Sequence, residues 1–364
     1  MSPGQKKQLT VIAKPTHDCN LGCEYCYIDP NTDLGRMSET TLWNMTSKVL
    51  DIHDSVRFIW HGGEPFLMPL SFYERAVEFQ RRYPDRQVIN NVQTNGTLVT
   101  DETLDFCERY GFNIGYSLDG TMQINDATRH TKDGKSVFDS TMTAIKKSQK
   151  RNLGCGVLVV VNRTNKDHLG EFYEFAKREG INIKVNPLIK AGKALQRYDD
   201  LGIGPLDYGK ALVGLFDIWL HDRSPIRLDP FDDLIEGLLT RESLVCSYSV
   251  SCQNHFISVG PQGNIYPCDK FVDTPGFYMG NINTDDLNEV LTSERRKWLR
   301  DRAERIHECL PCEYRPICNA GCMHNAYMQT GDIDTRDYYC ASYKLLFSHV
   351  KKMVEAELVK AEVK

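Results

Sequence analysis

The feature that most constrains this chain is the uneven distribution of its 13 cysteines. Three of them lie in the segment CNLGCEYC at 19–26, and eight more lie between 246 and 340. Their number is odd and the N-terminal residues lack the apolar stretch of an export signal, so disulfides explain them poorly. Tight cysteine clusters in such a chain indicate metal ligation, and the missing signal predicts a cytoplasmic location.

Composition narrows the class of protein further. A length of 364 residues suits one large domain, or a barrel with a smaller appended module. The net charge of −5 and the lack of a long basic run argue against a nucleic-acid partner. No apolar stretch is long enough for a membrane span, so no membrane partner is expected.

Short apolar runs alternate with amphipathic stretches through the first 222 residues or so. Strands alternating with helices of this length predict parallel βαβ units. The expected strands are 9–15, 56–62, 87–96, 112–120, 155–162 and 181–188, and the expected helices lie near 39–52, 70–82, 101–109, 136–151, 167–179 and 205–221. Six units are too few for an eight-stranded barrel, so we expect an α/β fold with an open, partial (β/α)6 TIM-like barrel.

The character of the sequence changes after the barrel region. A helix is expected at 229–239, then a loop-rich region with little apolar content to form a core, then a closing helix at 343–360. Small domains of that kind are usually held together by metals. The expected domains are a barrel at 1–225, a cysteine-rich domain at 226–345 and a C-terminal helix at 346–364.

Four of the expected strands end in polar, glycine-bearing segments. These are CNLGCEYC, HGGEP at 61–65, QTNG at 93–96 and SLDG at 117–120. Sites in barrel folds collect at the C-terminal ends of the parallel strands, so the segments are expected to converge on one cavity. Turn formation by glycine and asparagine explains any one of them, but it explains all four together less well.

The two groups of cysteines suit different kinds of site. The eight later cysteines fill two four-ligand sites, which suit zinc and four-iron, four-sulfur clusters equally. The N-terminal triplet Cys19, Cys23 and Cys26 has no fourth cysteine nearby. A four-iron cluster held by three thiolates leaves one iron with an open position, where a small molecule can bind and receive an electron.

The triplet C-x3-C-x2-C, followed by an aromatic residue and by GGEP after the next strand, resembles the radical S-adenosylmethionine (SAM) superfamily. The later cysteines resemble the SPASM extension of that superfamily, and the resemblance runs from about residue 9 to 345. It is nearest to anaerobic sulfatase-maturating enzymes and to SPASM maturases of ribosomal peptides, including cyclophane-forming ones. The resemblance implies three [4Fe-4S] clusters, SAM, a peptide or unfolded protein substrate, and a flavodoxin- or ferredoxin-type electron donor.

The resemblance also implies which residues hold the first cluster and the adenine of SAM. Cys19, Cys23 and Cys26 would ligate the cluster whose open iron chelates the amino and carboxylate groups of SAM. Tyr25, between the second and third cysteines, would contact the adenine, and Leu188 at the end of the sixth strand would pack on it.

Further SAM contacts are implied at the ends of the later strands. Gly62 and Gly63 would let the backbone approach SAM, and Glu64 would accept a hydrogen bond from its ammonium group. Ser117 would bond the ribose or the carboxylate, and Arg129 would pair with the methionyl carboxylate.

In the SPASM pattern the ligands of the two auxiliary clusters interleave. The first cluster would take Cys246, Cys252, Cys268 and Cys322, and the second would take Cys309, Cys312, Cys318 and Cys340. Full ligation by protein implies electron transfer. Cys107 and Cys155 are expected to be plain core residues.

Asp269 directly follows the expected ligand Cys268. It matches the proposed general base of sulfatase-maturating enzymes, and a carboxylate in a semi-buried cavity suits that task. The structural alternative is a carboxylate that caps the following turn.

The reaction implied is oxidation of a peptide. SAM would be cleaved reductively to a 5′-deoxyadenosyl radical, which abstracts a hydrogen atom from a side chain, and the product would be a crosslink or a carbonyl. A crosslink in a ribosomally synthesised peptide is the first expectation. The reason is Lys270, which stands where the resemblance to sulfatase-maturating enzymes implies an aromatic residue. Formylglycine formation on a sulfatase Cys or Ser is the alternative, favoured by DYYCASY at 337–343. A zinc-bound interaction scaffold would explain the cysteines, but not GGEP, QTNG and SLDG together.

Overall fold

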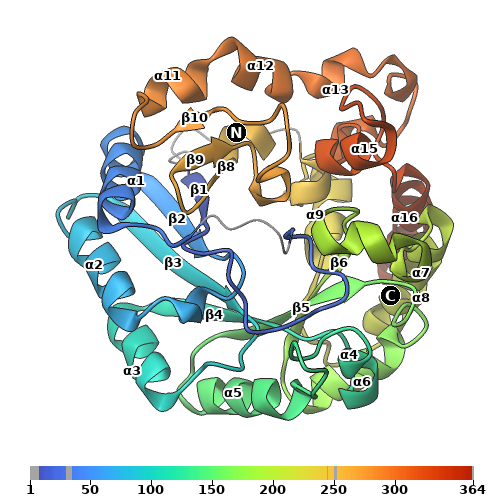
Figure 1. Ribbon diagram of the computed structural model, residues 1–364. Helices are drawn as coiled ribbons and strands as arrows, with labels where there is room; N and C mark the ends of the chain where they lie inside the picture. Colours follow the sequence, from blue (N-terminus) through green and yellow to red (C-terminus); the bar gives the residue numbers. More distant parts are fainter. Residues whose placement is uncertain (1–7, 30–34, 244, 250–251, 363–364) are drawn as a thin grey trace.

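The computed structural model describes residues 8–29, 35–243, 245–249 and 252–362. Its strands form one ten-stranded sheet in the order β10-β9-β8-β1-β2-β3-β4-β5-β6-β7. Pairing is parallel from β8 to β7 and antiparallel where β9 and β10 are added at one edge. The sheet curves around a central space, and helices surround it (Figure 1). The expected α/β fold with a parallel, barrel-like sheet is confirmed.

The six expected barrel strands and the six expected helices are present, together with short helices that were not expected. The strands are β1 (Gln8–Ala13), β2 (Ser55–Trp60), β3 (Gln87–Thr94), β4 (Phe112–Ser117), β5 (Cys155–Val161) and β6 (Asn182–Pro187). The helices are α1 (Glu39–Ile52), η1 (Pro65–Leu67), α2 (Leu70–Gln80), α3 (Asp101–Tyr110), α4 (Met122–Asp126), α5 (Phe138–Lys150), α6 (Leu169–Arg178), η2 (Gly192–Arg197), α7 (Tyr198–Leu201) and α8 (Pro205–Leu220).

Local sequence signals set several of these helix ends. Ser38 caps α1 by accepting a hydrogen bond from the backbone N–H of Thr41 at 3.1 Å. Thr100 and Thr103 form a reciprocal capping box at the start of α3, and Gly111 ends that helix in the left-handed conformation (φ 68°). Cys107 of α3 is fully buried in the main core, as expected. Cys155 begins β5, but its side chain lies outside the described part.

The C-terminal region is more regular than its sequence suggests. It contains β7 (Leu228–Asp229), α9 (Phe231–Thr240), η3 (Cys246–Tyr248), α10 (Cys252–His255), β8 (Phe256–Val259), β9 (Asn264–Tyr266), η4 (Asp269–Phe271), β10 (Gly280–Asn281), α11 (Leu287–Thr292), α12 (Glu294–Arg300), α13 (Arg302–Arg305), η5 (His307–Cys309), α14 (Arg315–Cys318) and α15 (Met323–Thr330). Because β8 pairs with β1, this region continues the barrel sheet.

The expectation that this region has little core is wrong. Tyr266, Phe271, Phe277, Leu299, Met323 and Ile333 form a second hydrophobic cluster. Phe271 and Phe277 stack with their ring centroids 4.0 Å apart. These apolar residues are spread singly along the chain, so no short window shows the periodicity that would reveal them.

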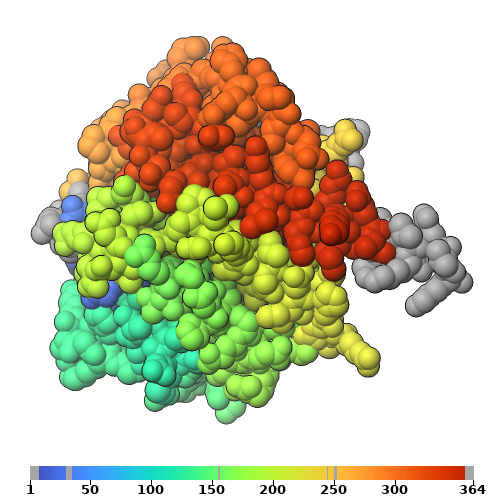
Figure 2. Space-filling model, turned by 90° about the vertical axis from the view of Figure 1, so that its right-hand side faces the viewer, coloured from blue at the N-terminus to red at the C-terminus, as the bar shows by residue number. Residues whose placement is uncertain are grey.

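The last helix, α16 (Cys340–Glu362), packs along α8. Figure 2 shows it crossing the face of the barrel helices. Gly209 of α8 permits the close approach, because a Cβ there would lie 2.9 Å from the Cα of Ser342. His349 also pairs with Asp217 at 2.6 Å. The domain boundaries at 225 and 345 stay a prediction.

None of the described helices combines the length and the apolar character that crossing a membrane requires. The cytoplasmic location stays a prediction.

Candidate functional site

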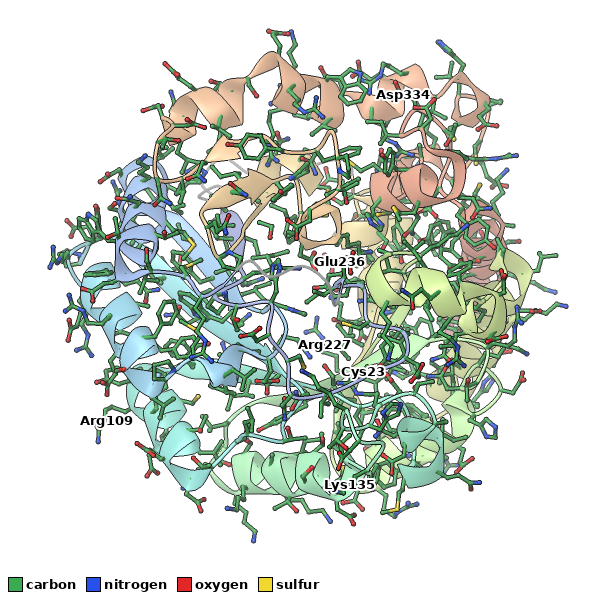
Figure 3. All side chains as sticks on the ribbon, viewed as in Figure 1. Cys23, Arg109, Lys135, Arg227, Glu236 and Asp334 are labelled. Carbon is green, nitrogen blue, oxygen red and sulfur yellow. The ribbon has the colours of Figure 1, made fainter. Side chains whose placement is uncertain are left out.

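The cysteine triplet lies in the segment that follows β1, at the end of the barrel where the parallel strands finish. Figure 3 shows Cys23 inside the ring of helices, whereas Arg109 and Lys135 point outward at its rim. The polar segments after β2, β3 and β4 all contact this loop through the bonds described below, so their expected convergence is confirmed.

The HGGEP segment holds the cysteine loop by backbone contact. Gly63 donates its N–H to the carbonyl of Thr16 at 3.0 Å, and Glu64 donates to the carbonyl of Asp18 at 2.8 Å. A Cβ on Gly63 would lie 2.0 Å from the Asp18 carbonyl oxygen, and one on Gly62 (φ 137°) would lie 2.3 Å from that of Thr16. Both glycines are therefore required by the approach of two protein backbones, apart from any ligand.

The carboxylate of Glu64 organises the same end of the barrel from within. It is fully buried and accepts hydrogen bonds from Phe66 N–H at 3.0 Å, Thr94 Oγ1 at 2.8 Å and Asn95 N–H at 2.8 Å. Burial raises its pKa. Asn95 in turn donates from Nδ2 to Asn20 Oδ1 at 2.9 Å, which ties QTNG to the cysteine loop. The bond from Glu64 to a SAM ammonium group stays a prediction.

Tyr25 belongs to a buried polar network. Its hydroxyl donates to Asp119 and accepts from Arg129 Nη1 at 2.7 Å. Asp119 also accepts from the backbone N–H of Val160 at 2.8 Å, so it joins the loop to β5. The ring of Tyr25 packs in one buried cluster with Leu188. Three residues expected to contact SAM thus lie together, and Asp119, part of SLDG, is the member that the sequence did not single out.

Ser117 stands at the end of β4 and accepts a hydrogen bond from Gln93 Nε2 at 3.1 Å. Gln93 begins the QTNG segment, so Ser117 lies beside the same set of loops. Its contact with SAM stays a prediction.

The short helix η2 holds the cysteine loop from the β6 side. The Lys193 ammonium donates to the carbonyl of Gly22 at 2.8 Å, and Arg197 Nη1 donates to Glu24 at 2.8 Å. The backbone N–H of Ala194 donates to the carbonyl of Cys26 at 3.1 Å. These contacts were not predicted from the sequence, because η2 has no motif of its own.

The three thiols of the loop suit a metal cluster by their chemistry. Burial raises the pKa of Cys23, and the pKa of Cys19 is raised to about 12, chiefly by burial and in part by the neighbouring thiols of the triplet. A bound metal would offset both effects, because its charge stabilises the thiolates that ligate it. Cys19 Sγ also accepts the backbone N–H of Leu21 at 3.4 Å, a bond typical of a ligating sulfur.

The later cysteines fall into the two interleaved sets expected from the SPASM pattern. In the first set, a hydrogen bond with Cys246, burial and the charges of Cys268 and Cys322 all raise the pKa of Cys252. Lys270 lies beside this set. Burial raises the pKa of Cys268 and Cys322, and the nearby charge of Lys270 partly opposes that effect.

The second set lines a hollow at the surface. Burial raises the pKa of Cys318, and Asp337 and the thiols of Cys340, Cys309 and Cys312 raise it further. All four cysteines line one hollow of about 460 Å³, adjoining open solvent included. In the described ranges no three His, Cys, Asp or Glu side chains converge closely enough to hold a single metal ion.

Asp269 lies at the junction between the barrel and the cysteine-rich region. Its carboxylate accepts a hydrogen bond from the Tyr27 hydroxyl at 3.1 Å, and its carbonyl accepts one from Lys14 Nζ at 3.4 Å. Burial raises its pKa, but Lys14, His61, Lys270 and the Tyr27 hydroxyl outweigh that effect and the pKa is lowered. The side chain is therefore a carboxylate that faces the end of the barrel.

Three partners of Asp269 were missed from the sequence. Lys14 is 1% exposed, and its ammonium lies 4.6 Å from the centroid of the Tyr27 ring. Tyr27 also lies 3.5 Å from His61 Nδ1. The signals available were a lysine at the end of a strand, an aromatic residue after the last cysteine of the triplet, and the histidine that begins HGGEP.

Two protein-family models match this chain and define its general class. The family model "Radical SAM superfamily" matches residues 13–176, and the model "Iron-sulfur cluster-binding domain" (SPASM) matches residues 250–313. These domains imply iron–sulfur clusters and SAM as cofactors.

Relatives narrow the class to a family. A serine-type anaerobic sulfatase-maturating enzyme of Bacteroides thetaiotaomicron is 30% identical over 94% of this chain and 90% of its own length. A cysteine-type one of Clostridium perfringens is 29% identical over 94% and 96%. The solved structure "Native anSMEcpe with bound AdoMet and Kp18Cys peptide" is 27% identical, covers 96% of this chain and 98% of its own, and superposes with a TM-score of 0.87. The chain belongs to the radical SAM/SPASM family of the anaerobic sulfatase-maturating enzymes.

Proposed function

We propose that this protein oxidises a Cys or Ser side chain of an unfolded sulfatase segment to formylglycine. The observation that carries the proposal is similarity over more than nine-tenths of the chain to both serine-type and cysteine-type sulfatase-maturating enzymes. A related structure binds AdoMet and a peptide together, which supports a peptide substrate here.

These findings favour the alternative over the first expectation, a crosslink. That expectation depended on Lys270. Although burial lowers the pKa of Lys270, the charges of Cys322, Cys246 and Cys268 outweigh it and raise the pKa. Lys270 therefore lies beside the cysteines of the first auxiliary set, where its charge would stabilise their thiolates, and this position accounts for the lysine without a crosslinking substrate.

The chain would hold three [4Fe-4S] clusters with the three sets of cysteines. Cys19, Cys23 and Cys26 would hold the first; Cys246, Cys252, Cys268 and Cys322 the second; and Cys309, Cys312, Cys318 and Cys340 the third. Bound clusters and SAM would supply the radical that removes a hydrogen atom from the substrate Cβ, and would accept the second electron. Tyr25, Gly62, Gly63, Glu64, Ser117, Arg129 and Leu188 would surround SAM.

The protein's own groups would position the substrate and take its proton. The Asp269 carboxylate would accept the proton that leaves as the carbonyl forms from Ser or the thiocarbonyl from Cys. Water would then hydrolyse the thiocarbonyl to the aldehyde and release hydrogen sulfide. The Tyr27 hydroxyl, 3.1 Å away, would fix the orientation of that carboxylate. Buried Lys14 would keep Asp269 ionised, because a charge nearby favours the carboxylate.

Transfer of a labelled hydrogen tests the proposal. Peptides from sulfatase active-site segments, with deuterium on the Cβ of the target Cys or Ser, are incubated anaerobically with enzyme, SAM and reductant. Deuterium is expected in the 5′-deoxyadenosine released. If SAM is cleaved with every such peptide and no deuterium is transferred, the target Cβ is not the reacting atom and the proposal fails.

A further inference from the structure

A small cavity lies between the barrel and the cysteine-rich region. Its empty volume is about 230 Å³, adjoining open solvent included, so it is a small hollow that opens to the surface. Leu188 after β6 and Tyr198 of α7 line it from the barrel, and His324 of α15 with Tyr338 and Tyr339 line it from the other side.

His324 is an unusual lining residue. It is 1% exposed, yet neither ring nitrogen reaches hydrogen-bond geometry with any described group. The main chain of Lys270 lies near the ring without meeting that geometry, and Phe271 packs edge-on with its centroid 4.9 Å away. A buried polar group without a partner costs free energy, so a partner supplied by a bound molecule would be favourable.

The cavity adjoins the region expected to hold SAM. Leu188, which lines the cavity, belongs to the same buried cluster as Tyr25, and Tyr198 packs against that cluster. The Tyr339 hydroxyl donates to the carbonyl of Leu188 at 3.2 Å, which fixes the shared wall. A group in the cavity would therefore sit close to the reacting residue of a peptide.

The charges around the cavity oppose an ionised occupant. Lys190 lines the cavity with its ammonium 5.2 Å from the Tyr198 ring centroid, and it disfavours a second cation. On the other wall Asn325 donates to the buried carboxylate of Asp337 at 3.2 Å, and that carboxylate disfavours an anion. An imidazole offers one donor and one acceptor, which a neutral amide or hydroxyl group can satisfy at the same time.

We propose that this cavity is a specificity pocket for a residue flanking the modified Cys or Ser, and that it selects an uncharged amide or hydroxyl side chain through His324. The inference depends on the proposed function for the identity of the peptide. The pocket would make the enzyme prefer peptides with such a residue beside the target. Three tyrosines form its apolar walls around the polar contact with His324.

A binding experiment isolates this determinant from the chemistry. Labelled sulfatase-derived peptides carry Ala at the target position, so they are not turned over, and each flanking position is varied among Asn, Gln, Ala, Asp and Lys. Their dissociation constants are measured by fluorescence anisotropy with the reconstituted enzyme and SAM. At one flanking position the wild type is expected to bind the Asn peptide about tenfold more tightly than the Ala peptide, the effect of one or two hydrogen bonds.

Three variants test the assignment to the pocket. His324→Leu should abolish the Asn-over-Ala difference, and His324→Asn should restore part of it. Tyr198→Ala, on the opposite wall, should widen the pocket and admit Gln as well as Asn. His221→Gln, at an exposed histidine on the far end of α8, is the matched control and should keep the wild-type preference. Iron content is measured for each variant, because His324 is close in sequence to Cys322.

The outcomes separate this inference from the proposed function. Loss of the preference in His324→Leu with iron content retained supports the pocket. An unchanged preference in His324→Leu and Tyr198→Ala, or no preferred flanking residue in the wild type, overturns it. If the wild type shows the preference but never modifies the corresponding Cys or Ser peptides, the pocket stands and the proposed function fails.

Discussion

Replacing Gly63 with Ala should disrupt the backbone contacts that hold the cysteine loop against the HGGEP segment. The added Cβ would lie 2.0 Å from the Asp18 carbonyl oxygen and 2.4 Å from that of His17, so the two backbones must separate by about 1 Å. That movement breaks the bonds from Gly63 N–H to Thr16 and from Glu64 N–H to Asp18. With about 1 kcal/mol for each bond and about 1–3 kcal/mol for overpacking, the loop loses roughly 3–5 kcal/mol.

Iron and acid-labile sulfide after anaerobic reconstitution measure this effect. Wild type should hold about 12 irons if each cysteine set binds four, and Gly63→Ala should hold about eight and cleave no SAM. Gly204→Ala is the matched control, because nothing lies within 4 Å of a Cβ there and its φ of −70° suits alanine. A Gly63→Ala protein with full iron content and normal SAM cleavage would refute this account of the glycine pair.

Three further substitutions follow from the site and the fold. Replacing Cys19, Cys23 and Cys26 together with Ala should leave about eight irons and abolish SAM cleavage; zinc without labile sulfide in the wild type would contradict the cluster assignment. Asp269→Asn should keep iron content and SAM cleavage but yield little modified peptide, whereas a wild-type yield would show that the carboxylate is dispensable. The pKa of Asp222 is lowered to about 2, chiefly by a lysine hydrogen bond, so its stabilisation is present above the unfolded pKa of 3.8 and lost as pH falls towards 2. Asp222→Asn should therefore lower the Tm equally at pH 7 and pH 5, with a smaller difference below about pH 4; a constant difference throughout would disprove the assignment.

The sequence predicted the barrel because its signals are local. Each of the six expected strands and six expected helices between residues 8 and 222 or so carries its own periodicity, and the structure reproduces those elements within a few residues. The short helices η1, α4, η2 and α7 were not predicted. The convergence of HGGEP, QTNG and SLDG on the cysteine loop also followed, since parallel strands finish at one end of a barrel.

The sequence could not predict contacts that depend on tertiary packing. Lys14 meets Asp269, 255 positions away, only because β8 pairs with β1 and brings η4 to the barrel. The contacts of η2 with Gly22 and Glu24 likewise follow from the position of β6. The glycine pair was interpreted as a ligand contact, whereas its tightest neighbours are carbonyl oxygens of the chain itself.

The mass of the product tests the central proposal most directly. A sulfatase-derived peptide with Cys or Ser at the target position is incubated with reconstituted enzyme, SAM and reductant, then analysed by fragment mass spectrometry. We predict that Ser loses two hydrogens, or that Cys exchanges sulfur and two hydrogens for one oxygen, with the change confined to that residue. A loss of two hydrogens that links two residues, or unchanged masses for every sulfatase peptide while SAM is consumed, would contradict formylglycine formation.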